Sequence, residues 1–141
     1  MSAAGTIHAT CIATSAGGVL LLGPSGSGKS DLALRLVDRG AKLVSDDQVA
    51  LRVENEKLIA ATPGALFGKL EVRGVGICEV PAQPEVVVAL IVALGDEGDR
   101  LPDQPTMTME GIALPLLRLA PHRASTPIKI ELALSQGVGT E

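Results

Sequence analysis

The sequence predicts one strand-rich α/β domain with few helices across residues 1–141. Small and β-branched side chains, which favour strands, recur in short segments separated by turn-forming residues. An amphipathic helix is expected over 30–38, where leucines alternate with polar residues and Gly40 follows as a stop signal. A length of 141 residues suits one compact domain. The expected strands cover residues 6–13, 18–22, 42–45, 49–53, 58–61, 70–79 and 86–94.

Turn residues organise the first strands into neighbouring pairs. Ser15-Ala16-Gly17 lies between the first two strands, and a segment containing Asn55 lies between the fourth and the fifth. Serine, glycine and asparagine favour turns because they tolerate left-handed backbone or bond to their own main chain. We therefore expect a tight turn in the first pair and a hairpin in the second.

The C-terminal third contains a loop and one ambiguous segment. Residues 95–104 combine glycines, prolines and acids and predict an exposed loop. Residues 128–134 carry apolar side chains at alternate positions, as a strand would. The Ser-Thr-Pro sequence at 125–127 and Gly137 are instead typical of the two ends of a helix. We favour a helix for this segment.

The charge balance and the apolar segments argue against several classes of protein. Twelve lysines and arginines against 16 acids leave a formal net charge of −4, so we expect no basic surface for nucleic acid or an anionic membrane. Residues 1–18 lack the features of a secretion signal, and the longest apolar run, 86–94, is too short to span a bilayer. Cys11 and Cys78 form no C-x-x-C pair and are expected to be buried thiols. We therefore expect a cytoplasmic protein without nucleic-acid or membrane partners.

Between the strand at 18–22 and the helix at 30–38 the sequence matches G-x-x-x-x-G-K-[ST]. Glycines let the backbone curl so that successive N–H groups form a nest for phosphate oxygens at the start of the helix. Lys29 is a candidate catalytic residue that adds positive charge toward the β- and γ-phosphates of ATP or another nucleoside triphosphate. The hydroxyl of Ser30 is a candidate Mg²⁺ ligand. The predicted phosphate-binding residues are Gly23, Pro24, Ser25, Gly26, Ser27, Gly28, Lys29 and Ser30.

Two adjacent acids, Asp46 and Asp47, follow the strand expected over 42–45. In a phosphate-binding α/β fold, a carboxylate beside the phosphate site holds metal or water. Aspartate is also common in solvated turns and caps. The phosphate-binding loop that precedes this pair favours a functional role.

Three segments, 23–31, 43–49 and 70–77, together resemble the HPr kinase/phosphorylase family. The third segment reads Leu70-Glu71-Val72-Arg73-Gly74-Val75-Gly76-Ile77 and is the distinctive one. Other P-loop kinases carry no E-[IV]-R-G-[LV]-G-I stretch downstream of the loop lysine. The resemblance implies an α/β P-loop kinase domain of the HPr kinase / PEP carboxykinase-like type.

The resemblance also implies roles for individual side chains. Asp47 would be the general base that takes the proton of a target serine, and Asp46 would support the metal or the geometry. Glu71 matches a second Mg²⁺-linked acid of the family. His8 falls where the family has a histidine near the active site, and Arg100 matches a catalytic arginine. Taken without the family, these last three are an exposed strand acid, a structural histidine and a solvated loop cation.

The activity implied is that of an Mg-ATP-dependent protein-serine kinase acting on an HPr-like phosphocarrier of a phosphotransferase system. Family members also remove the phosphate and assemble as homo-oligomers, hexamers in particular. The P-V-K-x-G-R segment tied to dephosphorylation appears here only as Ala120-Pro121-His122-Arg123, so kinase activity is implied more directly than phosphorylase activity. Phe67 is the one aromatic residue, with no Trp or Tyr, which predicts loose selectivity for the nucleotide base.

Two alternatives stay open on the sequence alone. A small-molecule P-loop kinase should show an arginine-rich lid, yet the loop at 95–104 holds only Arg100. A nucleotide-sensing binding module would have lost catalysis, and the retained acids Asp46, Asp47 and Glu71 argue against it.

Overall fold

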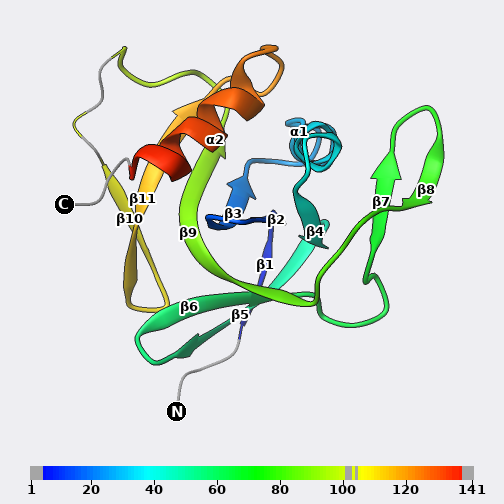
Figure 1. Cartoon of the computed structure of the whole chain (residues 1–141), viewed down its shortest axis with the longest axis horizontal. Coiled ribbons are helices and arrows are strands. Elements are labelled where there is room, and N and C mark those ends of the chain that lie inside the picture. The colour runs from blue at the N-terminus through cyan, green and yellow to red at the C-terminus, as the bar shows by residue number, and fades with distance from the viewer. Residues whose placement is uncertain (1–4, 101–102, 104, 138–141) are drawn as a thin grey trace.

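A computed structural model describes residues 5–100, 103 and 105–137 (Figure 1). Strands dominate this part of the chain, and the two helices in it lie far apart in sequence. The elements are β1 Gly5–His8, β2 Thr10–Thr14, β3 Gly17–Leu22, α1 Lys29–Asp38, β4 Lys42–Ser45, β5 Gln48–Glu54, β6 Lys57–Ala61, β7 Lys69–Val72, β8 Gly76–Glu79, β9 Glu85–Leu94, β10 Thr106–Met109, β11 Ile112–Leu119 and α2 Thr126–Gln136.

The central strand of the large sheet is β9. The main path through the sheet runs β1-β5-β6-β9-β3-β2-β4, and β11, flanked by β10, also pairs with β9. The first part of β9 pairs with β6 in antiparallel fashion, whereas its last part runs parallel to both β3 and β11. The strand curves strongly between these two parts (Figure 1). Strand β9 therefore connects the antiparallel strands β5 and β6 to the part of the sheet that contains β3 and β11.

Strand directions bring several chain segments to one edge of the sheet. Strand β2 is antiparallel to both β3 and β4, so β3 and β4 run in the same direction. Their carboxyl ends, those of β9 and β11, and the start of β2 consequently lie at the same edge. In open α/β sheets this edge is where ligands bind. The glycine-rich loop follows β3 there, and the two adjacent aspartates follow β4.

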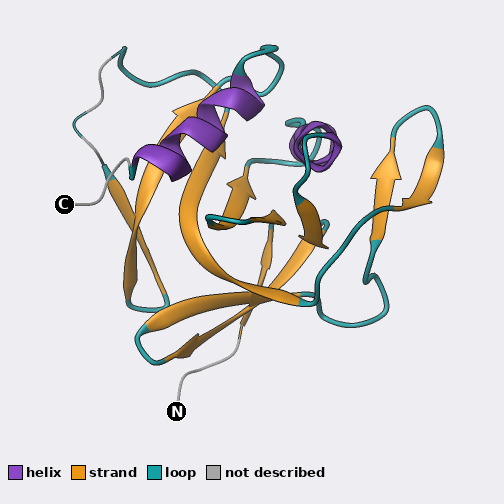
Figure 2. Ribbon diagram, in the orientation of Figure 1, coloured by secondary structure: helices purple, strands orange, loops and turns teal. Residues whose placement is uncertain are grey.

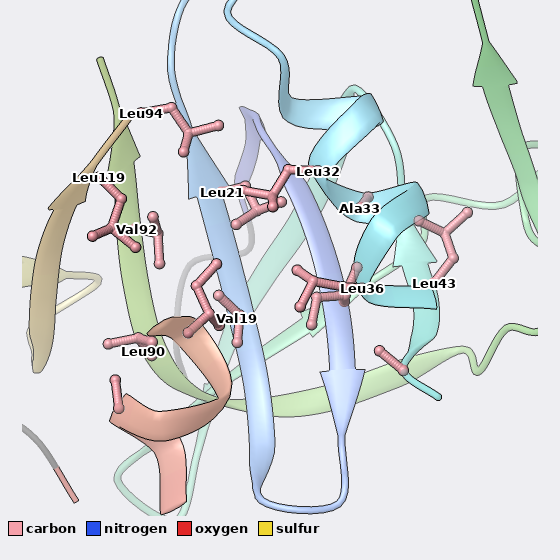
Figure 3. Packing of buried hydrophobic residues seen from close by; sticks show 14 of the residues in the cluster. Val19, Leu21, Leu32, Ala33, Leu36, Leu43, Leu90, Val92, Leu94 and Leu119 are labelled. Atoms are coloured by element: carbon pink, nitrogen blue, oxygen red, sulfur yellow. The ribbon is translucent and has the colours of Figure 1, made fainter. Parts of the chain in front are cut away.

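Side-chain alternation along the strands builds two apolar cores. Val19 and Leu21 of β3 face α1 and α2, where they pack with Leu32 and Leu36 of α1 (Figure 3). Leu20 points to the opposite face, toward β5 and β6. Figure 2 shows both helices on the same side of the curved strands. Successive residues of β3 thus point alternately into the two cores, as expected for a strand buried on both faces.

The structure confirms the strand-rich α/β class and most predicted elements. The helix expected over 30–38 is α1, and the segment at 128–134 is helical, within α2. The hairpin around Asn55 is β5–β6, with Asn55 and Glu56 in left-handed backbone (φ 52° and 64°).

Two predicted strands were wrong in their extent. The segment at 70–79 is not one strand but the β7–β8 hairpin, because Gly74 and Gly76 take left-handed φ values of 90° and 122° and turn the chain. This hairpin forms its own small sheet beside α1 (Figure 1). The segment at 6–13 divides at Ala9, since β1 pairs with β5 while β2 pairs with β3 and β4.

Strands β10 and β11 were not predicted. Pro115 lies within β11, although proline lacks the N–H that a central strand must donate. Strand β11 nevertheless pairs with β10 through its first part and with β9 through its last part. No helix within the described ranges is both long and apolar enough to cross a lipid bilayer.

The two cysteines differ in exposure, which corrects the expectation that both are buried. Cys11 is buried in β2, and burial raises the pKa of its thiol well above the usual range. Cys78 is partly exposed on β8. Because the thiolate is the reactive form, the folded protein should react with Ellman's reagent at Cys78 and not at Cys11.

A thiol titration tests this difference. One thiol should react quickly in buffer and two in denaturant, and Cys78→Ser should abolish the fast reaction. A fast reaction that survives in Cys78→Ser would contradict the buried position of Cys11.

Candidate active site

The loop between β3 and α1 has the conformation that its glycines permit. Gly26 and Gly28 have φ values of 82° and 100°, and Gly28 is the N-cap of α1. The Ser27 N–H donates to the Pro24 carbonyl at 3.0 Å, which closes the curl. The Ser27 hydroxyl is buried and has no hydrogen-bond partner among the described residues. A buried, unsatisfied hydroxyl beside free N–H groups at a helix start fits a phosphate oxygen as the missing partner.

Lys29 lies folded over this loop. Its side chain is only 7% exposed, and its Nζ donates to the carbonyls of Gly23 at 2.6 Å and Pro24 at 3.0 Å. In the part of the chain that the structure describes, no carboxylate forms an ion pair with it. A buried ammonium without a counter-charge is costly. An anion such as a nucleotide phosphate would supply that charge.

Asp46 is the buried member of the acidic pair. It is 8% exposed, and one oxygen, Oδ1, accepts hydrogen bonds from the hydroxyls of Ser30 at 2.8 Å and Thr10 at 3.0 Å. Because Ser30 gives its proton to Asp46, its oxygen lone pairs stay available to a cation. Oxygen ligands of this kind suit Mg²⁺.

The donor set also limits how Mg²⁺ would be held. The described residues contain no group of three or more His, Cys, Asp or Glu side chains that could hold a metal ion. Mg²⁺ is usually bound through one or two protein ligands together with substrate phosphates and water. The residues therefore fit a metal that arrives with a nucleotide, held near Ser30 and Asp46.

Asp47 is the exposed member of the pair. Its backbone is left-handed (φ 73°), its carbonyl accepts from the Ala9 N–H at 3.2 Å, and its side chain is 63% exposed. His8 Nδ1 lies 3.2 Å from Asp47 Oδ1, and His8 Nε2 lies 3.4 Å from the Ser25 hydroxyl. This network holds the Asp47 carboxylate at the mouth of the site. Adjacent acids thus reach different environments, one buried and one open to a substrate.

A pocket of about 590 Å³ joins these groups. Glu71 of β7 and Arg73, which follows β7, line one side, and His122, from the segment after β11, lines another. A Cβ atom on Gly28 would lie 3.1 Å from His122 Cε1, so this ring packs directly over the loop. The predicted site residues that line the pocket are His8, Ser25, Gly26, Gly28, Lys29, Ser30, Asp46, Asp47 and Glu71.

The predicted residues Gly23, Pro24 and Ser27 belong to the loop but do not line this pocket, and Arg100 lies away from both the loop and the pocket. The segment after β9 folds against β11, where the Gly98 N–H donates to the Arg118 carbonyl at 3.2 Å. Arg100 lines a separate pocket of about 720 Å³ beside α2, together with Lys129 and Leu132. The catalytic role implied by the resemblance therefore gains no support from this geometry and stays a prediction.

Thr10, Arg35 and His122 were not predicted as site residues from the sequence. Thr10 is a β-branched residue in a strand segment, and nothing nearby in the sequence marks its hydroxyl. Arg35 of α1 donates to the carbonyls of Pro121 and, at 3.1 Å, Arg123, so it holds the segment that carries His122. These contacts join residues far apart in sequence. For His122, the available signal was its place in the 120–123 segment, which stands where the family has P-V-K-x-G-R.

Comparison with known proteins agrees with this geometry. The sequence model of the protein family HPr Serine kinase C-terminal domain matches residues 1–84, more than half of the chain. The chain belongs to this family. The HPr kinase/phosphorylase of Limosilactobacillus reuteri (strain DSM 20016) is 34% identical over 138 residues, which cover 88% of this chain. The HPr(Ser) kinase/phosphatase from Coxiella burnetii superposes with a TM-score of 0.80 at 31% identity, covering 94% of this chain and 90% of that one.

The family membership confirms the resemblance inferred from the three sequence segments, and the structural match confirms the strand-rich α/β fold class. The chain spans less than half the length of the curated relatives it matches, for example 41% of the L. reuteri protein. The HPr kinase/phosphorylase of Clostridium botulinum (strain Eklund 17B / Type B) is 43% identical over 74 residues, which cover 24% of that protein.

The contacts of Arg35 predict a local effect of its loss. Arg35→Gln removes the charged donor that holds the carbonyls at 121 and 123. We expect backbone amides at 120–125 to exchange hydrogen at least about tenfold faster, because hydrogen bonds to charged groups contribute about 1.5–3 kcal/mol. Mass-spectrometric hydrogen exchange measures this change. Arg39→Gln, which removes the arginine at the C-cap of α1 that pairs with Glu131 of α2, is the matched control and should leave hydrogen exchange at 120–125 unchanged.

Proposed function

We propose that this chain is the catalytic domain of an Mg-ATP-dependent kinase that phosphorylates a serine of an HPr-like phosphocarrier. One observation carries the proposal: Asp47 presents an exposed carboxylate to the same pocket that contains Lys29 and the phosphate-binding loop. A protein hydroxyl can approach Asp47 from outside while the phosphates lie within. The names of the relatives support this substrate class.

The proposed reaction assigns one task to each group. The loop N–H groups and Lys29 bind the β- and γ-phosphates of ATP and balance their charge. Asp47 accepts the proton of the serine hydroxyl as the serine oxygen forms its bond to the γ-phosphorus and the bond from that phosphorus to the β-bridging oxygen breaks. ADP leaves with the displaced oxygen. When bound, Mg²⁺ neutralises charge on the phosphates, and Ser30 and Asp46 would hold it.

His8 orients the base in this scheme. A proton on Nδ1 can be donated to Asp47 Oδ1, which leaves Nε2 to accept from the Ser25 hydroxyl. That tautomer holds the carboxylate toward the pocket without neutralising it. Glu71 at the rim would act as the second acid near the metal, as the resemblance implies.

The remaining parts of the proposal concern assembly and location. We include the reverse reaction and a homo-oligomer, as the family resemblance implies, and a cytoplasmic site of action, as expected from the sequence. Val75 and Ile77 on the β7–β8 hairpin are 74% and 68% exposed, and a neighbouring subunit would cover such apolar side chains. Sedimentation of the purified protein would test the oligomer, and a monomer at all concentrations would remove it from the proposal.

Transfer to the carrier should depend on the exposed carboxylate. Asp47→Asn removes the base, and general-base catalysis contributes about 10²–10⁴-fold, so we expect a loss of phosphotransfer in that range. The protein is mixed with Mg-ATP and a panel of HPr-like carriers, and added phosphate is measured by intact mass. Nucleotide affinity should stay within about twofold, because Asp47 acts on the acceptor and not on ATP.

Asp99→Asn is the matched control, since this exposed aspartate lies outside the phosphate pocket. It should retain transfer. ATP binding without transfer to any carrier would favour a nucleotide-sensing module. Transfer to a metabolite would favour a small-molecule kinase.

The pocket also predicts weak selection for the base. Phe67 does not line the pocket, so no Phe, Tyr or Trp ring offers a stacking surface there. The rings that do line it are the smaller imidazoles of His8 and His122. An aromatic pair contributes about 0.5–1.5 kcal/mol. The kcat/KM values for ATP and GTP should therefore differ by less than about tenfold with the same carrier and Mg²⁺ concentration. A much larger preference for ATP would contradict this expectation.

A further inference from the structure

Thr10 is a buried polar residue that the proposed reaction does not use. Its side chain is fully buried (0% exposed) at the first position of β2. Valine has nearly the same shape and would avoid the cost of burying a hydroxyl. Among the described residues, the hydroxyl has one hydrogen-bond partner, Asp46 Oδ1 at 3.0 Å. The reason for a threonine here therefore concerns Asp46.

The sheet register places Thr10 beside that carboxylate. Cys11, the next residue, pairs with Ser45 of β4, and Asp46 follows Ser45 directly. The Thr10 hydroxyl thus reaches Asp46 from β2, whereas Ser30 reaches it from the first turn of α1. Two donors from two elements meet at the same oxygen. Such a pair fixes the position and the rotation of a carboxylate more tightly than one donor would.

The two bonds leave the other carboxylate oxygen unused. Asp46 Oδ2 has no hydrogen-bond partner among the described residues and is not a buried unsatisfied atom. Asp46 also lines the phosphate pocket. Oδ2 is therefore available to a cation or its water shell. Because the Ser30 hydroxyl donates its proton to Oδ1, the lone pairs of the Ser30 oxygen are available to the same cation.

We propose that Thr10 is a positioning residue for the metal-nucleotide complex. Its hydroxyl holds Asp46 so that Ser30 and Oδ2 both face the place where Mg²⁺ would lie. This inference rests on the proposed nucleotide site, but it does not require transfer to a carrier. Hydrogen-bond partners of metal-linked carboxylates typically change metal affinity by about 10–100-fold when they are removed.

The test uses Thr10→Val and follows binding of a fluorescent ATP analogue to the full chain, in Mg²⁺ and in EDTA. The Mg²⁺ concentration that gives half of the Mg²⁺-dependent increase in affinity should rise at least about tenfold. Affinity in EDTA should stay within about twofold, because the loop and Lys29 are unchanged. Thr10→Ser keeps the hydroxyl and should restore the wild-type Mg²⁺ dependence.

Thr14→Val is the matched control on the same strand, since the Thr14 hydroxyl bonds to Gly17 in the turn and lies outside the pocket. It should leave the Mg²⁺ dependence unchanged. If Thr10→Val does not fold, Thr10→Cys replaces it, because a thiol is a weak donor, and it should shift the Mg²⁺ dependence in the same direction.

Two results would overturn the proposal. The first is an unchanged Mg²⁺ dependence in a folded Thr10 variant without the hydroxyl. The second is an equal loss of affinity in Mg²⁺ and in EDTA, which would mark Thr10 as a structural residue only. Wild-type protein that binds the Mg²⁺-nucleotide but phosphorylates no carrier would refute the proposed substrate and leave the role of Thr10 standing.

Discussion

The antiparallel pairing of β2 with both β3 and β4 is the constraint on which the site depends. This arrangement makes β3 and β4 run in the same direction, so the loop after one and the aspartates after the other meet at one edge. The same strand supplies Thr10 at its start. Apolar side chains of β3 fill a core on each face, which resists a one-residue slip, because such a slip would exchange the two faces. The geometry of the phosphate pocket therefore follows from the packing of the sheet.

Within that frame, burial separates the tasks of charged groups that are neighbours in sequence. Asp46 is held inside by two hydroxyls, whereas left-handed backbone at Asp47 turns the next carboxylate toward the opening. Among the described residues, Lys29 is buried with carbonyl partners only. The pocket thus combines a cation that has no counter-ion in the described part of the chain with a carboxylate that a protein hydroxyl can reach. Both are features that phosphoryl transfer to serine uses.

Helix α1 connects the pocket to the rest of the domain. Its first turn supplies Lys29 and Ser30, and its Arg35 holds the segment that carries His122. Arg39, at the C-cap of α1, donates two hydrogen bonds to the carboxylate of Glu131 in α2. Exposed pairs each contribute little to the free energy of unfolding. Their arrangement matters more for geometry, because a shift of α1 would move the phosphate loop and the opposite wall together.

The sequence alone determined the features that depend on local chemistry. The glycine pattern, the lysine and the hydroxyl of the loop, the acidic pair and the E-V-R-G-V-G-I segment were readable because their residue types and spacing carry the information. The turn at Asn55 and helix α1 were readable for the same reason, whereas α2 was indicated only by the residue types at its two ends.

Only the tertiary structure decided which distant residues meet. It brought Thr10 to Asp46 and His122 to Gly28, placed Arg100 in a different pocket, and made β11 a partner of β9 despite Pro115. Each of these outcomes depends on strand pairing between segments far apart in the chain. Local propensity does not encode such pairing, because the packing energy that selects it exists only once the sheet has formed.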